Sequence, residues 1–247
     1  MRLTRALLCF TAIAAAAAGA AGQEGKPPVP PGRDPGGVAV ALIAAGVDYR
    51  QPALARLLAR DGEGELIGWD FEDNDRRPFD RGKGQGVDGT AVAGILLGAE
   101  GARLVPVRMS PSDPVSPAQG LAFAARTPAR VALLPAVGAA PQTLAALRAA
   151  ATRFKHVLVI LPADDARAAG SDLPALDNVL GVEPAGESVE AVGFGGRIQR
   201  LAGAPLSAAA AGRAAAALLA REPGLDAAGL KRRLIEAGGG ALWHAKP

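Results

Sequence analysis

The sequence predicts an α/β fold with a mostly parallel central sheet. From Val38 onward, short apolar runs alternate with segments of helical periodicity, an alternation typical of strands joined by right-handed helical crossovers. The apolar runs are continuous and rich in Val, Leu and Ile, as expected of strands that are buried on both faces. The length of 247 residues fits one globular domain plus a targeting segment. A composition of 49% hydrophobic and 21% charged residues excludes a wholly disordered or coiled-coil protein.

The strands are expected where short apolar runs end at glycine, proline or charged residues. VAVALIA (38–44) stops just before Gly46, and GELIGWDF (64–71) leads into a charged, glycine-rich loop that reaches Gly89. The full set of expected strands is 38–44, 64–71, 102–109, 129–138, 156–163 and 178–185.

The helices are expected where apolar residues recur at spacings of three and four. PALARLLAR (52–60) and PQTLAALRAAATRF (141–154) show this spacing. GTAVAGILLG (89–98) consists mostly of small residues, so this helix is expected in a tightly packed place. The full set of expected helices is 52–60, 89–98, 117–126, 141–154, 206–221 and 225–238.

Residues 1–22 read as a secretory signal peptide. Arg2 and Arg5 precede an apolar run over 6–18, and small residues follow it, which is the pattern of a signal peptide with its cleavage site. The run is short and dominated by alanine, so a membrane anchor fits it less well. We therefore expect an exported protein, periplasmic or extracellular, with no membrane association after cleavage. The alanine-rich composition points to a bacterial source.

Residues 23–37 form a Pro/Gly-rich linker, which is expected to act as an extended spacer. The globular domain then covers 38–247.

Charge and cysteine content exclude several classes of function. The formal net charge is +3. Loss of Arg2 and Arg5 with the signal peptide would lower it to +1 (25 − 24). No basic patch is interleaved with aromatic residues, so nucleic-acid binding is not expected. The single cysteine, Cys9, lies in the signal peptide, which excludes disulfides and cysteine nucleophiles in the mature chain. His156 and His244 have neither a serine nor a carboxylate beside them at a strand end, and two histidines are too few for a zinc site that needs three or four ligands. No cofactor or metal is therefore expected apart from the calcium alternative considered next.

An acidic stretch is the one candidate for a cation site. It contains Asp70, Glu72, Asp73, Asp75 and Asp80. Carboxylates of this kind can hold calcium, but the spacing is irregular and neighbouring arginines offset the charge. A solvated surface loop is therefore the preferred interpretation, with calcium as the alternative.

The spacing Gly84-x-Gly86-x-x-Gly89 matches a dinucleotide-binding loop. A strand should come directly before such a loop, and here the preceding residues form a charged loop instead. We interpret the glycines as a tight entry into the helix expected at 89–98.

Six segments resemble, in order, the motifs of subtilisin-like serine proteases (subtilases, peptidase S8 family). VAVALIAAGVDYRQPAL (38–54) resembles the segment V-A-V-I-D-T-G-V-D-x-x-H-P-x-L, and GVDGTAVAGILLG (86–98) resembles the G-H-G-T-x-V-A-G helix. The segment 203–234 is similar to the G-T-S-M-A-x-P-H-V-A-G helix and the helix after it. Three further segments look like core strands of the family: 67–75, 102–109 and 174–185. This resemblance implies a subtilisin-like three-layer α/β/α fold with a mostly parallel central sheet.

The catalytic positions depart from the family pattern. The positions of the catalytic Asp, His and Ser hold Ala44, Asp88 and Pro205, and the position of the oxyanion-hole Asn holds Asp164. A serine nucleophile needs a base, a group that orients the base, and oxyanion donors. Alanine and proline supply none of these, so we expect a catalytically inactive domain.

The resemblance also places a relict substrate cleft. Its substrate-pairing edge falls on Ala136, Val137 and Gly138, where an extended peptide could pair with the backbone. The expected partner is therefore a peptide or protein ligand in this cleft, or the domain serves as a scaffold.

The alternative is an active serine-type endopeptidase of the subtilase or sedolisin type. Sedolisins, acid-acting relatives, use a carboxylate in place of the histidine and an Asp at the oxyanion position, so Asp88, Asp164 and Ser207 could form such a site. Ser207 lies two residues past Pro205, which on a helix is a rotation of about 200°. We therefore expect it to cap or pack the helix start. A third possibility is a decaying gene product on which no function has been selected. Such a protein would be expected to lack a cooperative thermal transition.

Overall fold

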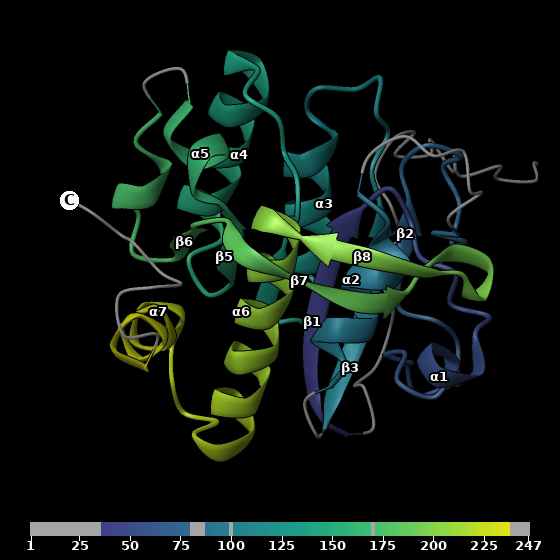
Figure 1. Cartoon of the computed structure of the whole chain (residues 1–247). Coiled ribbons are helices and arrows are strands. Elements are labelled where there is room, and N and C mark those ends of the chain that lie inside the picture. Colours follow the sequence, from purple (N-terminus) through teal and green to yellow (C-terminus); the bar gives the residue numbers. More distant parts are fainter. Residues whose placement is uncertain (1–35, 80–86, 99–100, 169–170, 238–247) are drawn as a thin grey trace, which may run out of the picture.

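A six-stranded parallel sheet forms the centre of the domain (Figure 1). The computed structural model describes residues 36–79, 87–98, 101–168 and 171–237. The predicted signal peptide and all but the end of the linker lie outside these residues, as do Gly84, Gly86 and His244. The strands are β1 (Val38–Ala44), β2 (Trp69–Asp70), β3 (Ala102–Arg108), β4 (Val131–Leu133), β5 (Leu158–Pro162) and β6 (Val179–Val182).

The strand order is β2-β3-β1-β4-β5-β6. The pairing of β1 with β3 runs from Val38 opposite Ala102 to Ala44 opposite Arg108. β1 lies between β3 and β4, so the strands that follow it in the sequence are added first on one side of it and then on the other. Crevices for ligands form outside the carboxyl ends of the strands at such a point.

Helices cover both faces of the sheet. Side chains of Val40, Leu42 and Ala44 point to one face, where α2 (Gly89–Leu96), α6 (Gly203–Arg221) and α7 (Ala227–Ala237) pack. Alternate residues of β1 face the other layer, as the two-residue period of a strand requires. That layer contains α3 (Ser116–Ala124), α4 (Pro141–Arg153) and α5 (Ala163–Arg167). The three-layer α/β/α prediction is confirmed.

The long helix α6 packs closely because alanine and glycine make up most of its buried face. A Cβ on Gly212 would lie 2.9 Å from Cδ1 of Leu96, so a larger residue there would require the Leu96 side chain to shift. Among the described residues, α6 is the helix with the length and hydropathy of a membrane span, but 56% of that window is buried inside the domain. We therefore describe α6 as a core helix.

The prediction of a helix over 52–60 is wrong beyond its first turn. α1 covers only Pro52–Ala55, because the next residues pair with β3 instead. Leu104 donates its N–H to the carbonyl of Leu57, and Ala59 donates its N–H to the carbonyl of Leu104. The strand expected at 64–71 likewise shortens to β2, and the strand expected at 129–138 shortens to β4. Tertiary pairing has overridden local periodicity here.

A two-stranded antiparallel hairpin is missing from the sequence-based prediction. It consists of β7 (Ala185–Val192) and β8 (Ile198–Ala202), joined by the 3-10 turn η3 (Phe194–Gly196). Ala191 and Leu201 are buried in the same core as α2 and α6. Figure 1 shows the hairpin, in light green, lying across α6 and α2 in front of the sheet. A second 3-10 turn, η2 (Leu173–Ala175), precedes β6.

Candidate functional site

A cleft of about 250 Å³ lies at the carboxyl ends of β4, β5 and β6, beside the first turn of α6. We call it the β4–β6 cleft. Three of the predicted site residues, Ala136, Asp164 and Pro205, line it together. Most of the remaining wall is proline, alanine and valine, so the cleft is largely apolar. The other two degenerate positions, Ala44 and Asp88, are not among the described residues that line this cleft. The structure therefore brings together only part of the predicted site.

Ala44 ends β1 beneath the start of α2. It is 2% exposed, and a Cβ placed on Gly89 would lie 3.3 Å from the Ala44 methyl group and 2.2 Å from the Gly46 carbonyl oxygen. The helix start thus lies directly on the end of the strand. A methyl group at this point has no atom with which to orient a base.

Asp88 uses both carboxylate oxygens to hold local structure together. Oδ1 caps α2 by accepting the N–H groups of Thr90 at 2.8 Å and Ala91 at 3.3 Å. Oδ2 accepts the N–H of Phe194 at 2.9 Å and Nε2 of Gln199 at 2.6 Å. Capping alone satisfies orphan donors of a helix, but here one side chain also joins the helix to the β7–β8 hairpin. This carboxylate serves as a structural bridge.

Asp48 and Gln51 hold the same hairpin turn from the other side. The Asp48 Oδ2 atom accepts the N–H of Gly195 at 3.1 Å, and Gln51 donates Nε2 to the carbonyl of Gly193 at 2.8 Å. The Asp48 N–H itself donates to Oγ1 of Thr90 at 3.0 Å. Together with Asp88, these side chains fix the turn onto the end of β1 and the start of α2.

The sequence did not reveal that Asp48, Gln51 and Gln199 hold the hairpin against the end of β1 and the start of α2. Asp48 could have been found, because it matches the second Asp of the motif in 38–54. The two glutamines carry no local signal, since their roles depend on where the hairpin lies.

The acidic residues of α5 have divided roles. The Asp164 side chain is 82% exposed and lies 3.3 Å from the Arg167 guanidinium. Asp165 accepts through Oδ2 the N–H groups of Val137 at 2.9 Å and Gly138 at 3.3 Å. Two of the three N–H donors on the predicted substrate-pairing edge are therefore already occupied by a carboxylate of the chain itself.

Pro205 and Ser207 share the first turns of α6 but differ in environment. Pro205 is half-buried at the cleft and has neither a hydroxyl nor an N–H. Ser207 is 1% exposed, and its hydroxyl donates to the carbonyl of Gly203 at 3.4 Å. In the described part of the chain, no hydrogen bond joins any two of Asp88, Asp164 and Ser207. The geometry thus gives the endopeptidase alternative no assembled catalytic group.

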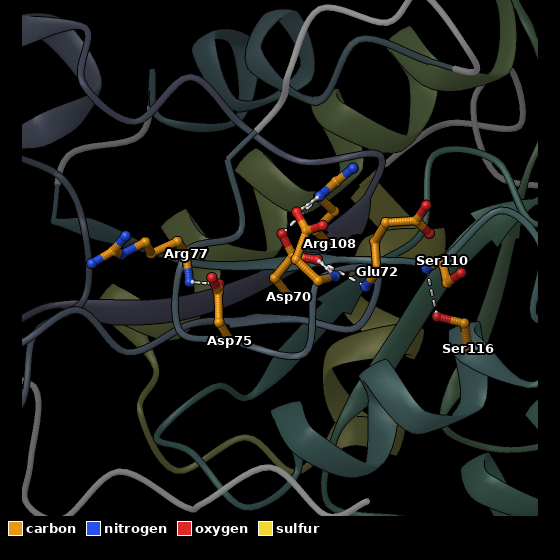
Figure 2. Close-up of polar contacts among 8 residues, drawn as sticks. Asp70, Glu72, Asp75, Arg77, Arg108, Ser110 and Ser116 are labelled. Atoms are coloured by element: carbon orange, nitrogen blue, oxygen red, sulfur yellow. Dashed lines mark hydrogen bonds and ion pairs between the residues drawn. The ribbon is translucent and has the colours of Figure 1, made fainter.

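Two of the candidate calcium residues, Asp70 and Asp73, contact a buried arginine, Arg108, and Figure 2 shows Asp70 beside it. Asp80 lies outside the described residues. Nη1 of Arg108 lies 2.8 Å from Oδ2 of Asp70, which is fully buried, and 2.7 Å from Oδ2 of Asp73. Asp70 Oδ1 also accepts the N–H groups of Glu72 and Asp73. Among the residues that the structure describes, no group of three or more His, Cys, Asp or Glu side chains is arranged to hold a metal. The donors do not fit calcium, because an arginine takes the place of the cation.

Figure 2 also shows one contact within this acidic loop and one in the loop that follows β3. Asp75 accepts the N–H of Arg77 at 2.6 Å, and Ser116, at the start of α3, accepts the N–H of Ser110 at 2.9 Å. These contacts order the loops around Arg108 without a ligand.

Arg108 itself was not singled out from the sequence. Burial alone would lower the pKa of its guanidinium, but the hydrogen bonds and charges of Asp70 and Asp73 outweigh that effect and raise the pKa above its ordinary value. The side chain therefore stays charged in the folded domain. Arg108 lies directly opposite Ala44 in the sheet.

Solved structures of subtilisin-like proteases share this fold. A cold-adapted subtilisin-like serine proteinase is 17% identical, with 80% of this chain and 81% of that chain covered and a TM-score of 0.54. A lanthipeptide protease is 17% identical, with 79% and 78% covered and a TM-score of 0.61. The subtilase cytotoxin SubAB is 14% identical, with 83% and 82% covered and a TM-score of 0.60. No protein-family model and no curated protein sequence matches the chain. The domain thus has a subtilisin-like α/β fold with a six-stranded parallel sheet.

Proposed function

We propose that this chain is an exported, catalytically inactive subtilisin-like domain that binds an extended peptide in the β4–β6 cleft. The observation that carries this proposal is the set of hydrogen bonds that the Asp88 carboxylate accepts. The residue at the position of the family's general base is committed to four hydrogen bonds that join α2 to the hairpin.

The other two catalytic positions support the same conclusion. Ala44 offers only a methyl group beneath α2, and Pro205 offers no nucleophile at the cleft. Hydrolysis with a serine nucleophile needs the nucleophile, a base and a group that orients the base to act together. The nearest hydroxyl along α6, that of Ser207, is buried and donates to the helix backbone.

The cleft that remains suits one side chain of a peptide ligand. Its volume of about 250 Å³ and its proline and alanine walls favour an apolar group. Because Asp165 occupies the N–H groups of Val137 and Gly138, a peptide would pair there through the carbonyl oxygens of the loop. Asp164 adds one exposed carboxylate at the wall.

The test measures retention of peptides from a mixed library by the mature chain beginning at Gln23. Ala204→Phe places a bulky ring in the cleft wall, and Ala149→Phe puts the same ring on the exposed side of α4 as a control. We expect the wild type and Ala149→Phe to retain the same peptides and Ala204→Phe to lose them, by about tenfold in affinity. Equal retention by all three proteins would overturn the assignment of the cleft as the binding site.

A further inference from the structure

Three aromatic rings come together at the tip of the β7–β8 hairpin. The rings of Tyr49 and Phe79 meet edge to face at 5.4 Å, and those of Phe79 and Phe194 do so at 6.0 Å. All three residues are only half-buried. Three of the nine Phe, Trp and Tyr residues of the chain (6 Phe, 2 Trp and 1 Tyr) therefore lie together at this tip.

The same tip carries the most exposed large apolar side chains of the described residues. Val192 is 48% exposed and Ile198 is 69% exposed. They face each other across the two strands, immediately before and after the turn that contains Phe194. We call Tyr49, Phe79, Val192, Phe194 and Ile198 the hairpin-tip patch. Contiguous exposed apolar surface of this kind marks an interaction site more often than scattered single residues do.

Three arginines lie beside this patch. The Arg50 guanidinium lies 3.9 Å from the centre of the Phe79 ring, and its side chain is 71% exposed. Arg77 and Arg197 are also exposed, and we call the three the rim arginines. Arg50 also pairs with Asp48, which is buried beneath the turn and whose Oδ1 lies 3.8 Å from the Arg50 Nε. Asp75 accepts the backbone N–H of Arg77, so the Arg77 guanidinium is not the donor in that bond.

The charges close to Tyr49 agree with this arrangement. Burial raises the pKa of the Tyr49 phenol and Asp75 raises it further, whereas Arg77 and Arg50 act against them. Both arginines therefore lie within electrostatic range of the patch. Aromatic residues and arginine are the types enriched in the cores of protein interfaces.

We propose that the hairpin-tip patch is a docking surface for an acidic segment of a partner polypeptide that also carries aliphatic side chains. The aliphatic groups would cover Val192 and Ile198, and the acidic groups would pair with the rim arginines. A single-stranded nucleic acid fits less well, because base stacking needs an open ring face. Here the rings meet edge to face, and Arg50 covers a face of Phe79. This surface is separate from the β4–β6 cleft.

The test uses an array of random dodecapeptides, probed with the mature chain, and the oligonucleotide dT12 in a parallel titration. Arg50→Gln/Arg197→Gln removes two rim charges, and Val192→Thr/Ile198→Thr makes the patch polar while keeping strand formers. Arg126→Gln/Arg232→Gln removes the same charge from exposed positions elsewhere and serves as the matched control. Thermal unfolding of each variant checks that the fold is intact.

We expect the wild type to select peptides that combine Asp or Glu with Leu, Ile, Val or Pro. Their affinity should fall about tenfold in each patch or rim variant, fall with added salt, and stay unchanged in Arg126→Gln/Arg232→Gln. It should also stay unchanged in Ala204→Phe, which separates this surface from the cleft. Selection without acidic enrichment, equal binding by the patch variants, or tighter binding of dT12 than of any peptide would overturn the proposal.

Discussion

Asp88→Ala is expected to lower the free energy of unfolding by about 2–4 kcal/mol. Loss of a helix cap costs roughly 0.5–2 kcal/mol, and hydrogen bonds to a charged acceptor are worth roughly 1.5–3 kcal/mol. Asp88 supplies both, because its two oxygens accept four hydrogen bonds from α2 and the hairpin. Urea denaturation at neutral pH, followed by circular dichroism, measures the change.

The matched control is Asp226→Ala. Asp226 is an exposed residue that accepts one N–H, that of Gly229 at 2.7 Å, at the start of α7. Its loss should cost about 1 kcal/mol, as for an ordinary cap. If Asp88→Ala were no more costly than Asp226→Ala, Asp88 would not be bridging the helix and the hairpin. Asp88→His should also destabilise the domain, since an imidazole cannot accept four hydrogen bonds.

Arg108→Met is expected to cost about 3–5 kcal/mol, the range measured when one partner of a buried ion pair is removed. The cost arises because Asp70, at 0% exposure, would keep a buried charge without its cation. Methionine fills much of the same volume, so lost packing contributes little. Urea denaturation again provides the measurement.

Two variants separate the charge effect from other causes. Arg148→Met breaks the exposed pair with Asp172 and should leave the midpoint nearly unchanged, because exposed ion pairs contribute little. The double variant Arg108→Met/Asp70→Asn removes the stranded charge and should recover part of the loss. A loss in Arg148→Met as large as that in Arg108→Met would refute the explanation by burial.

The sheet could be predicted from sequence because its strands carry their own signal. Continuous apolar runs at 38–44 and 102–109 correspond closely to β1 and β3, and burial on both faces makes such runs unambiguous. The helix expected at 52–60 failed for the opposite reason. Residues 57–59 meet the periodicity of a helix, but pairing with β3 satisfies their backbone groups instead.

The candidate site could be predicted only in part. The resemblance located Ala136, Asp164 and Pro205, which the structure brings together at one cleft. The four hydrogen bonds of Asp88 could not be predicted, because two of them come from a hairpin that lies more than a hundred residues further along the chain. Alternation of Val189 and Ala191 with polar residues before Gly193 was the signal that could have revealed that hairpin.

Cleavage of a mixed peptide library, read by mass spectrometry, tests the central claim most directly. The chain from Gln23 onward, which omits the predicted signal peptide, is compared with Ser207→Ala at about pH 4 and about pH 7.5, which cover acid-type and neutral catalysis. We predict no cleavage by either protein at either pH, since Ala44, Asp88 and Pro205 form no catalytic group and Ser207 is buried. Cleavage by the wild type that Ser207→Ala abolishes would contradict the account and identify Ser207 as a nucleophile.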